Sequence, residues 1–380
     1  MGMPVACAVR PNGIHLTNLG FQSMKNSLRA IVGALLLAGV GSVFAAGNPL
    51  SVELKAQASK AAPGESVLWQ ITNQSEETIY VLSWETPLKG LSRSIFDVSQ
   101  NGRPVRYMDQ VVHWGHPEAS DFVKIAPGQT LSAEVNLAAS YEMVNAGNYT
   151  VGFQGQLTYM TAADEKSGHV EELGGAALDA DAVDLYSAGR SPAYYQGLGA
   201  VTGPMNFTKA AAYANCTSSR QTSIASAHTQ AKTYATNSLN YLNAGSTGAR
   251  YTTWFGSYTS SRYTSVKSHY SKISGALNNS TVTYNCACAP ANASAFAYVY
   301  PSQPYNIYLC NAFWSAANAG TDSRGGTIVH EMSHFTVNGG TNDYAYGQTA
   351  AKNLARTNAN RAVQNADNHE YFSENTPAQN

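Results

Sequence analysis

The sequence predicts a multidomain chain, with an all-β, sandwich-like N-terminal domain followed by a mainly helical α+β domain. Short segments of alternating polar and apolar residues, separated by turn signals, fill residues 46–157. Long helical patterns interspersed with short strands fill residues 206–380. The segment 158–205 is rich in Ala, Gly, Asp and Ser, and is predicted to be a linker between the two domains. A chain of 380 residues is long enough for two such domains.

Residues 1–45 are expected to be an upstream extension followed by an export signal. Basic residues precede an apolar run from residue 30 to residue 40, which is short for a membrane span. Small residues then predict cleavage after Ala45, with Ala46 as the alternative. The chain is therefore expected to be secreted and to keep no membrane anchor after the signal is removed.

The N-terminal domain is predicted from period-two alternation between turns such as Asn101-Gly102 and Pro127-Gly128. The expected strands are Ser66–Thr72, Thr78–Ser83, Thr130–Leu137 and Asn148–Phe153. We find no catalytic set in this domain. His113 and His116 flank a tryptophan; they are interpreted as residues of a loop or domain contact, with metal binding as the alternative.

The C-terminal domain is predicted to open with two long helices, at 216–242 and 260–277. Short strands are expected at 281–284, 295–300 and 305–309, before a motif-bearing helix and a helical C-terminus. An edge strand beside the cleft could pair with an extended substrate.

The composition excludes some classes of partner. The formal net charge is −1 and only 12% of the residues are charged. Such a surface gives no electrostatic basis for binding nucleic acid or a membrane.

The pentapeptide His330-Glu331-Met332-Ser333-His334 is the main candidate for chemistry. Histidines at i and i+4 of a helix share one face and can hold a zinc ion, while the glutamate can take a proton from a bound water. Apolar residues precede the motif, which predicts a helix that is buried on one side. Asp322 or Ser323 is expected to cap the helix, and Gly339-Gly340 to end it.

The third metal ligand is expected nine residues after the second histidine. Asp343 follows two glycines that let the chain fold back beneath the metal, and it is preferred for this reason. Glu370, on a later helix, is the alternative.

These residues resemble the aspzincin metallopeptidases, the deuterolysin and peptidyl-Lys metalloendopeptidase family. The signature of that family is H-E-x-x-H followed by G-T-x-D-x-x-Y-G; here the sequence reads HEMSH and GTNDYAYG, without departure. The resemblance covers residues 206–380. Three segments resemble the peptidyl-Lys branch in particular: Tyr251–Gly256, Phe296–Pro301 and Asn365–Asn375.

The resemblance implies a zincin-type fold and one Zn²⁺ held by His330, His334 and Asp343. It also implies that Glu331 is the general base and that Tyr346 steadies the oxyanion. The activity expected from it is endopeptidase cleavage of proteins or peptides.

Specificity is expected to come from Asp367 and Glu370, which share one helix face at i and i+3. An acidic pair beside a zinc site suits the compact charge of a lysine. In the peptidyl-Lys branch such a pair forms the pocket for the residue after the cut, so cleavage at X–Lys bonds is expected. The alternative is a broader, deuterolysin-like specificity.

Four cysteines remain after signal removal, and an exported protein is expected to oxidise them. Sequence alone permits three pairings. The family resemblance implies Cys216–Cys286 and Cys288–Cys310.

The N-terminal domain is expected to be a propeptide that inhibits the enzyme until it is removed. Residues 46–215 contain no cysteine, so a carboxylate, a histidine or steric cover must block the zinc site. Lys209 offers an X–Lys bond for self-maturation. The alternative function for the whole chain, from a class other than enzymes, is that of a secreted, non-catalytic binding protein.

Overall fold

The computed structural model describes residues 48–57, 65–167, 175–198, 205–207 and 211–380. The predicted export signal and Lys209 lie outside the described residues. The part from Ala46 to Asn380 forms one compact unit.

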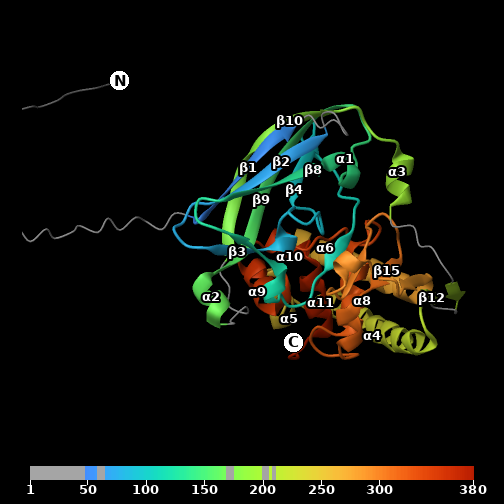
Figure 1. The fold of residues 1–380 in the computed structure, drawn as a ribbon. Helices are drawn as coiled ribbons and strands as arrows, with labels where there is room; N and C mark the ends of the chain where they lie inside the picture. The colour runs from blue at the N-terminus through green and yellow to red at the C-terminus, as the bar shows by residue number, and fades with distance from the viewer. Residues whose placement is uncertain (1–47, 58–64, 168–174, 199–204, 208–210) are drawn as a thin grey trace, which may run out of the picture. The chain divides into compact units, whose positions relative to one another are not determined.

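Two antiparallel sheets form the N-terminal part, and their strands lie together in Figure 1. One sheet has the order β1-β2-β8, with β1 (Leu50–Gln57), β2 (Ser66–Asn73) and β8 (Thr130–Asn136). The other has the order β5-β4-β9-β3-β7, with β10 paired to β9. Its strands are β3 (Ile79–Leu82), β4 (Phe96–Gln100), β5 (Arg103–Pro104), β7 (Phe122–Ile125), β9 (Gly147–Thr161) and β10 (Gly175–Ser187).

Alternation of apolar side chains builds the core between these sheets. Val67, Trp69 and Ile71 are fully buried along β2, and Trp69 packs edge-on against Phe153 of β9. This part also contains short helices, so strands are not its only elements: α1 (Leu137–Ser140), α2 (Ala162–Ser167) and α3 (Pro192–Gly197).

The linker predicted at 158–205 differs from the structure. Strand β10 lies within it and pairs antiparallel with β9 along most of its length. Leu178 and Leu185 of β10 are buried while neighbouring aspartates point outward. The period-two pattern is present in the sequence, but the Ala, Gly and Asp content of the segment concealed it.

A mixed sheet crosses the C-terminal part in the order β11-β12-β13-β15-β14-β6. Its strands are β11 (Met205–Phe207), β12 (Ala211–Ala214), β13 (Val282–Asn285), β14 (Ala297–Val299), β15 (Asn306–Leu309) and β6 (Val111–His113). Strand β6 comes from the N-terminal part of the sequence and pairs antiparallel with β14. The two parts of the chain therefore share a sheet.

Helices pack on this sheet (Figure 1). They are α4 (Ser218–Asn243), α5 (Ala249–Phe255), α6 (Ser260–Asn279), α7 (Asn311–Ser315), α8 (Arg324–His334), α9 (Gly347–Thr357), α10 (Ala359–Val363) and α11 (Ala366–Glu374). Helix α8 contacts both α4 and α11. Two disulfides, Cys216–Cys286 and Cys288–Cys310, tie α4 and β15 to the chain that follows β13, with the pairing that the resemblance implies.

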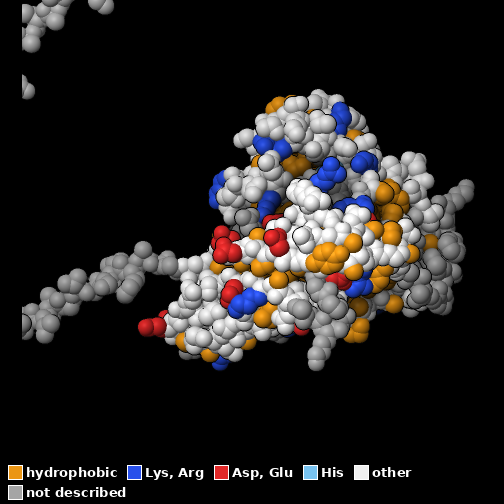
Figure 2. All heavy atoms as spheres, turned by 90° about the horizontal axis from the view of Figure 1, so that it is seen from above, with side chains coloured by type: hydrophobic (Ala, Val, Ile, Leu, Met, Phe, Trp, Pro, Cys, Tyr) orange, Lys and Arg blue, Asp and Glu red, His pale blue; other side chains and the backbone are white. Residues whose placement is uncertain are grey.

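Among the described residues, no helix combines the length and apolar character needed to cross a membrane. Figure 2 shows one face of the molecule, on which charged side chains lie among apolar side chains, uncharged polar side chains and backbone.

Candidate metal centre and active site

Helix α8 carries the motif, and Ser323 caps it. The Ser323 hydroxyl accepts from the backbone N–H of Gly326 at 3.0 Å and donates to Glu374 Oε1 at 2.8 Å. The helix ends at His334, so the end predicted at Gly339-Gly340 is wrong. The backbone N–H groups of both glycines donate to the Phe335 carbonyl, and Gly340 has φ +60°. The glycines thus form the turn that returns the chain beneath the helix.

His330, His334 and Asp343 converge on one point. His330 Nε2 lies 3.3 Å from Asp343 Oδ1, and His334 Nε2 lies 3.5 Å from Asp343 Oδ2. All three residues are fully buried. The two Nε2 atoms and Asp343 Oδ1 have no hydrogen-bond partner within the described part of the chain. Buried, unpaired atoms of this kind fit the N and O donors of a divalent metal site.

The imidazole ring of His334 has the orientation that a metal ligand needs. Its Nδ1 lies 2.9 Å from the Thr341 carbonyl oxygen, so an Nδ1–H donor leaves the lone pair of Nε2 facing Asp343. Burial lowers the pKa of His334 to about 4, which keeps the ring neutral near pH 7. A neutral imidazole is the form that binds a metal.

The general base expected from the sequence, Glu331, is also fully buried, and neither of its carboxylate oxygens has a hydrogen-bond partner among the described residues. Burial raises the pKa of Glu331 well above its usual value. A carboxyl whose proton affinity is raised in this way is suited to accept a proton from water.

Tyr346 lies on the loop that follows Asp343. Its hydroxyl donates to the carbonyl oxygen of Val112 at 2.9 Å and lies 3.2 Å from Asp343 Oδ2. The guanidinium of Arg93 donates to the Asp343 backbone carbonyl. Side chains from both parts of the chain therefore hold the Asp343 loop in place.

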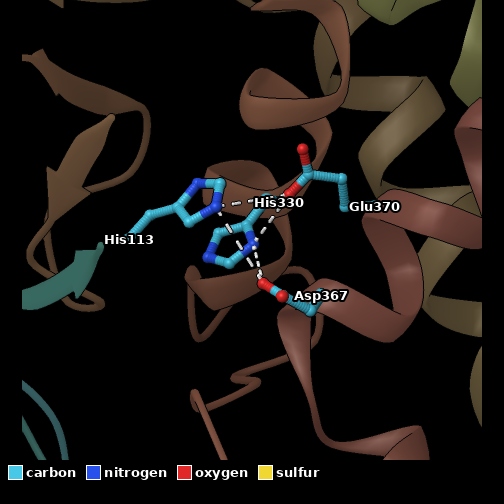
Figure 3. A group of neighbouring side chains, drawn as sticks. All are labelled: His113, His330, Asp367 and Glu370. Carbon is cyan, nitrogen blue, oxygen red and sulfur yellow. Dashed lines mark ion pairs between the residues drawn. The ribbon is translucent and has the colours of Figure 1, made fainter. Parts of the chain in front are cut away.

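Asp367 and Glu370 project from the first turns of α11 toward the other ring nitrogen of His330 (Figure 3). His330 Nδ1 lies 3.1 Å from Asp367 Oδ1 and 3.2 Å from Glu370 Oε2. Both carboxylates are fully buried. The predicted shared face of the pair is therefore present. Glu370, the alternative third ligand, lies on the opposite side of His330 from Asp343.

His113 lies in strand β6 and not in a loop, but it does lie at a contact between the two parts of the chain, as one of the two expected positions had it. It also reaches the same site (Figure 3). Its ring stacks on that of His330, with centroids 3.7 Å apart and planes 7° apart. Its Nε2 lies 3.5 Å from Glu370 Oε2, and its Nδ1 lies 3.8 Å from Glu331 Oε1. The expected domain contact is therefore present, but the sequence did not predict that this contact lies at the candidate metal centre.

His116, three residues further on, does not join the site. Its side chain is 76% exposed, and its closest acidic partner is Asp322 at 3.9 Å.

The fold and the site together define a metallopeptidase. The family model described as lysine-specific metallo-endopeptidase, of the aspzincin type, matches residues 240–374. An extracellular protease of Aeromonas hydrophila is 36% identical over 351 residues, which cover 91% of this chain and 98% of that protein. The chain belongs to the aspzincin metalloendopeptidase family, which supports the enzyme interpretation over a non-catalytic binding protein.

Fungal relatives are also similar. A peptidyl-Lys metalloendopeptidase of Grifola frondosa is 37% identical over 351 residues, covering 89% of this chain and 96% of that protein. One of Pleurotus ostreatus is 52% identical over 169 residues, covering 44% of this chain and 99% of that protein. A solved zinc peptidase from Grifola frondosa is 51% identical with a TM-score of 0.40, covering 43% of this chain and all of that one.

Proposed function

We propose that the protein is a secreted zinc endopeptidase that hydrolyses peptide bonds on the N-terminal side of lysine and is made as a preproprotein. The observation that carries the specificity is the buried carboxylate pair of Asp367 and Glu370 beside the candidate metal centre. Relatives named peptidyl-Lys metalloendopeptidase align over most of the chain, and this supports the same substrate class.

His330, His334 and Asp343 are the proposed zinc ligands, because their unpaired buried atoms face one another within 4.8 Å. Bound zinc supplies Lewis-acid polarisation of the scissile carbonyl and lowers the pKa of a water molecule. The carboxylates near His330 Nδ1 fix the orientation of its ring.

Glu331 is the proposed general base. It takes a proton from the attacking water and then transfers it to the departing amine, as a group of raised pKa can do. Tyr346 donates a hydrogen bond to the carbonyl oxygen as negative charge develops there. The hydroxyl of Tyr346 already donates to one peptide carbonyl in this structure, that of Val112.

The acidic pair is proposed to bind the ammonium of the lysine that follows the cut bond. Burial raises the pKa of both carboxyls, because their charged forms lose contact with water. A lysine ammonium would supply a full positive charge that stabilises the ionised pair. The buried position also excludes water, which strengthens the ion pair.

Export through residues 1–45 and release of the N-terminal domain complete the proposal. The relative named extracellular protease supports export. Cleavage before Lys209 would allow self-maturation, and the N-terminal sequence of the mature chain tests this step.

The specificity is tested with two peptides that differ only in lysine or norleucine after one bond. The mature chain is expected to cut the lysine peptide alone, and a chelator is expected to stop the cut. Equal cutting of both peptides would favour the alternative of a broader specificity.

A further inference from the structure

Strand β6 is added to the edge of the sheet at the candidate active site. Val111, Val112 and His113 pair antiparallel with Val299, Tyr298 and Ala297 of β14, respectively. The His113 carbonyl also accepts from the backbone N–H of Phe296 at 2.8 Å. Without β6, β14 would be an edge strand of this sheet. Addition of an extended segment to an exposed edge is a common way for a protein to bind a peptide.

The carbonyl of Val112 lies where the scissile carbonyl is expected. Its oxygen accepts the hydrogen bond from Tyr346, the residue proposed to stabilise the oxyanion. The same hydroxyl contacts Asp343, a proposed zinc ligand, at 3.2 Å. The peptide bond that follows this carbonyl joins Val112 to His113.

The side chain of His113 occupies the acidic pocket. Its Nε2 faces both pocket carboxylates, at 3.5 Å from Glu370 Oε2 and 4.0 Å from Asp367 Oδ1. The ring is enclosed between Phe296, at a centroid distance of 4.9 Å, and His330. Only 3% of the residue is exposed. This is the pocket assigned above to the lysine that follows the cut.

We propose that the N-terminal domain inhibits the enzyme by placing Val112–His113 in the position of the scissile bond, with His113 filling the lysine pocket. The inference rests on the proposed function and extends it to regulation. The imidazole is shorter than a lysine side chain and carries no ammonium, and its Nδ1 lies 3.8 Å from Oε1 of Glu331, the proposed base. The segment therefore binds like a substrate without being cut.

Peptide binding to the uncleaved full chain tests the occupation of the pocket. Glu331→Gln prevents self-cleavage, and a dye-labelled peptide with a single lysine reports binding by fluorescence anisotropy. His113→Ala in this background is expected to lower the Kd by at least about tenfold, because the competing segment no longer fills the pocket. His116→Ala is the matched control and is expected to leave the Kd unchanged, since its side chain is exposed.

The outcome of this experiment distinguishes a failure of the proposed inhibition by His113 from a failure of the proposed lysine-specific peptidase activity. If His113→Ala binds the peptide no more tightly than its parent while the mature enzyme still cuts X–Lys bonds, the inhibitory role of His113 is overturned and the function stands. A thermal melt checks that each variant is folded, and His113→Asn replaces His113→Ala if the latter unfolds.

The register is tested by His113→Lys in the active full chain. Hydrolysis would break the bond between the Val112 carbonyl carbon and the nitrogen of residue 113, with water supplying the hydroxyl and the proton. Mass spectrometry is expected to find this cut in His113→Lys and no new cut in the His116→Lys control. An intact bond in a chain that cuts added lysyl peptides would overturn the assignment of Val112–His113 to the scissile position.

Discussion

The hydroxyl of Tyr346 donates a hydrogen bond to the carbonyl oxygen of Val112 at 2.9 Å, across 234 positions of sequence. The bond joins the loop of a proposed zinc ligand to a strand contributed by the N-terminal domain. One peptide carbonyl is thus held at the hydroxyl that is proposed to bind the substrate carbonyl.

Replacing Glu331 with Gln is expected to lower the rate of peptide cleavage by about 10²–10⁴-fold, because the amide cannot accept the proton of water. The metal content, measured by atomic absorption, is expected to stay at one ion per chain, because Glu331 is not a proposed ligand. Full activity in a folded, metal-loaded variant would exclude Glu331 as the base.

Metal removal is expected to destabilise the protein, because His330, His334 and Asp343 would keep their buried polar atoms unpaired. At a free zinc concentration near 100 Kd, chelation should lower the free energy of unfolding by about 3 kcal/mol. Urea titrations of the Glu331→Gln chain, with and without chelator, measure this change. In Asp343→Ala the chelator should have little further effect; a full effect there would remove Asp343 from the ligand set.

Asp367→Asn and Glu370→Gln are expected to reduce the preference for lysine over norleucine. Loss of one partner of a buried charge pair costs about 2 kcal/mol or more, which corresponds to roughly a thirtyfold loss in kcat/KM for the lysine peptide. Both residues also lie near His330, so metal content is measured in parallel. An unchanged preference with full metal content would contradict the assignment of the pocket.

Gly326→Ala is expected to destabilise the chain by about 1–3 kcal/mol, as overpacking of a buried site does. The added methyl group would meet Glu374 Oε1 and would lie 2.8 Å from Glu370 Oε1. Gly275→Ala is the matched control, because open space surrounds that helical position. The control is expected to gain about 0.5–1 kcal/mol from helix propensity. The urea concentration at the midpoint of unfolding is therefore expected to fall in Gly326→Ala and to rise in Gly275→Ala.

Acid is expected to destabilise the chain through the buried pair of His269 and His369, whose Nδ1 and Nε2 atoms lie 3.0 Å apart. Burial lowers the pKa of His269 to about 4 and that of His369 to about 3. The unfolded chain, with histidine pKa values near 6.5, binds more protons below that pH. Stability is therefore complete above about pH 6.5 and falls as the pH drops toward 4.

The loss between pH 7 and pH 5 is expected to reach about 2 kcal/mol for each histidine. Unfolding free energies of the Glu331→Gln chain are compared with those of the same chain carrying His269→Gln. The variant should show a smaller decrease, and an equal decrease in both would contradict the role of the pair. Effects of pH on the metal site are common to both chains and cancel.

The sequence predicted the local features of the site well. Motif spacing and an N-cap serine predicted the helix that carries His330, and the two glycines predicted the returning chain before Asp343. Both features depend on residues near one another in the sequence.

The domain boundary near residue 206 stays a prediction.

The position of His113 could not be predicted in the same way. Strand β6 has three residues, and its partner β14 lies far along the sequence. Nothing local in Val-Val-His specifies a long-range pairing, because strand pairing depends on the whole sheet. The carboxylates of Asp367 and Glu370 likewise come close to His330 only after α8 and α11 pack together.

The lysine specificity is tested by a map of cut sites in a denatured protein treated with the mature enzyme, made by mass spectrometry with and without chelator. We predict chelator-sensitive cuts that all lie on the N-terminal side of lysine. Chelator-sensitive cuts spread over many residue types would contradict the lysine pocket formed by Asp367 and Glu370.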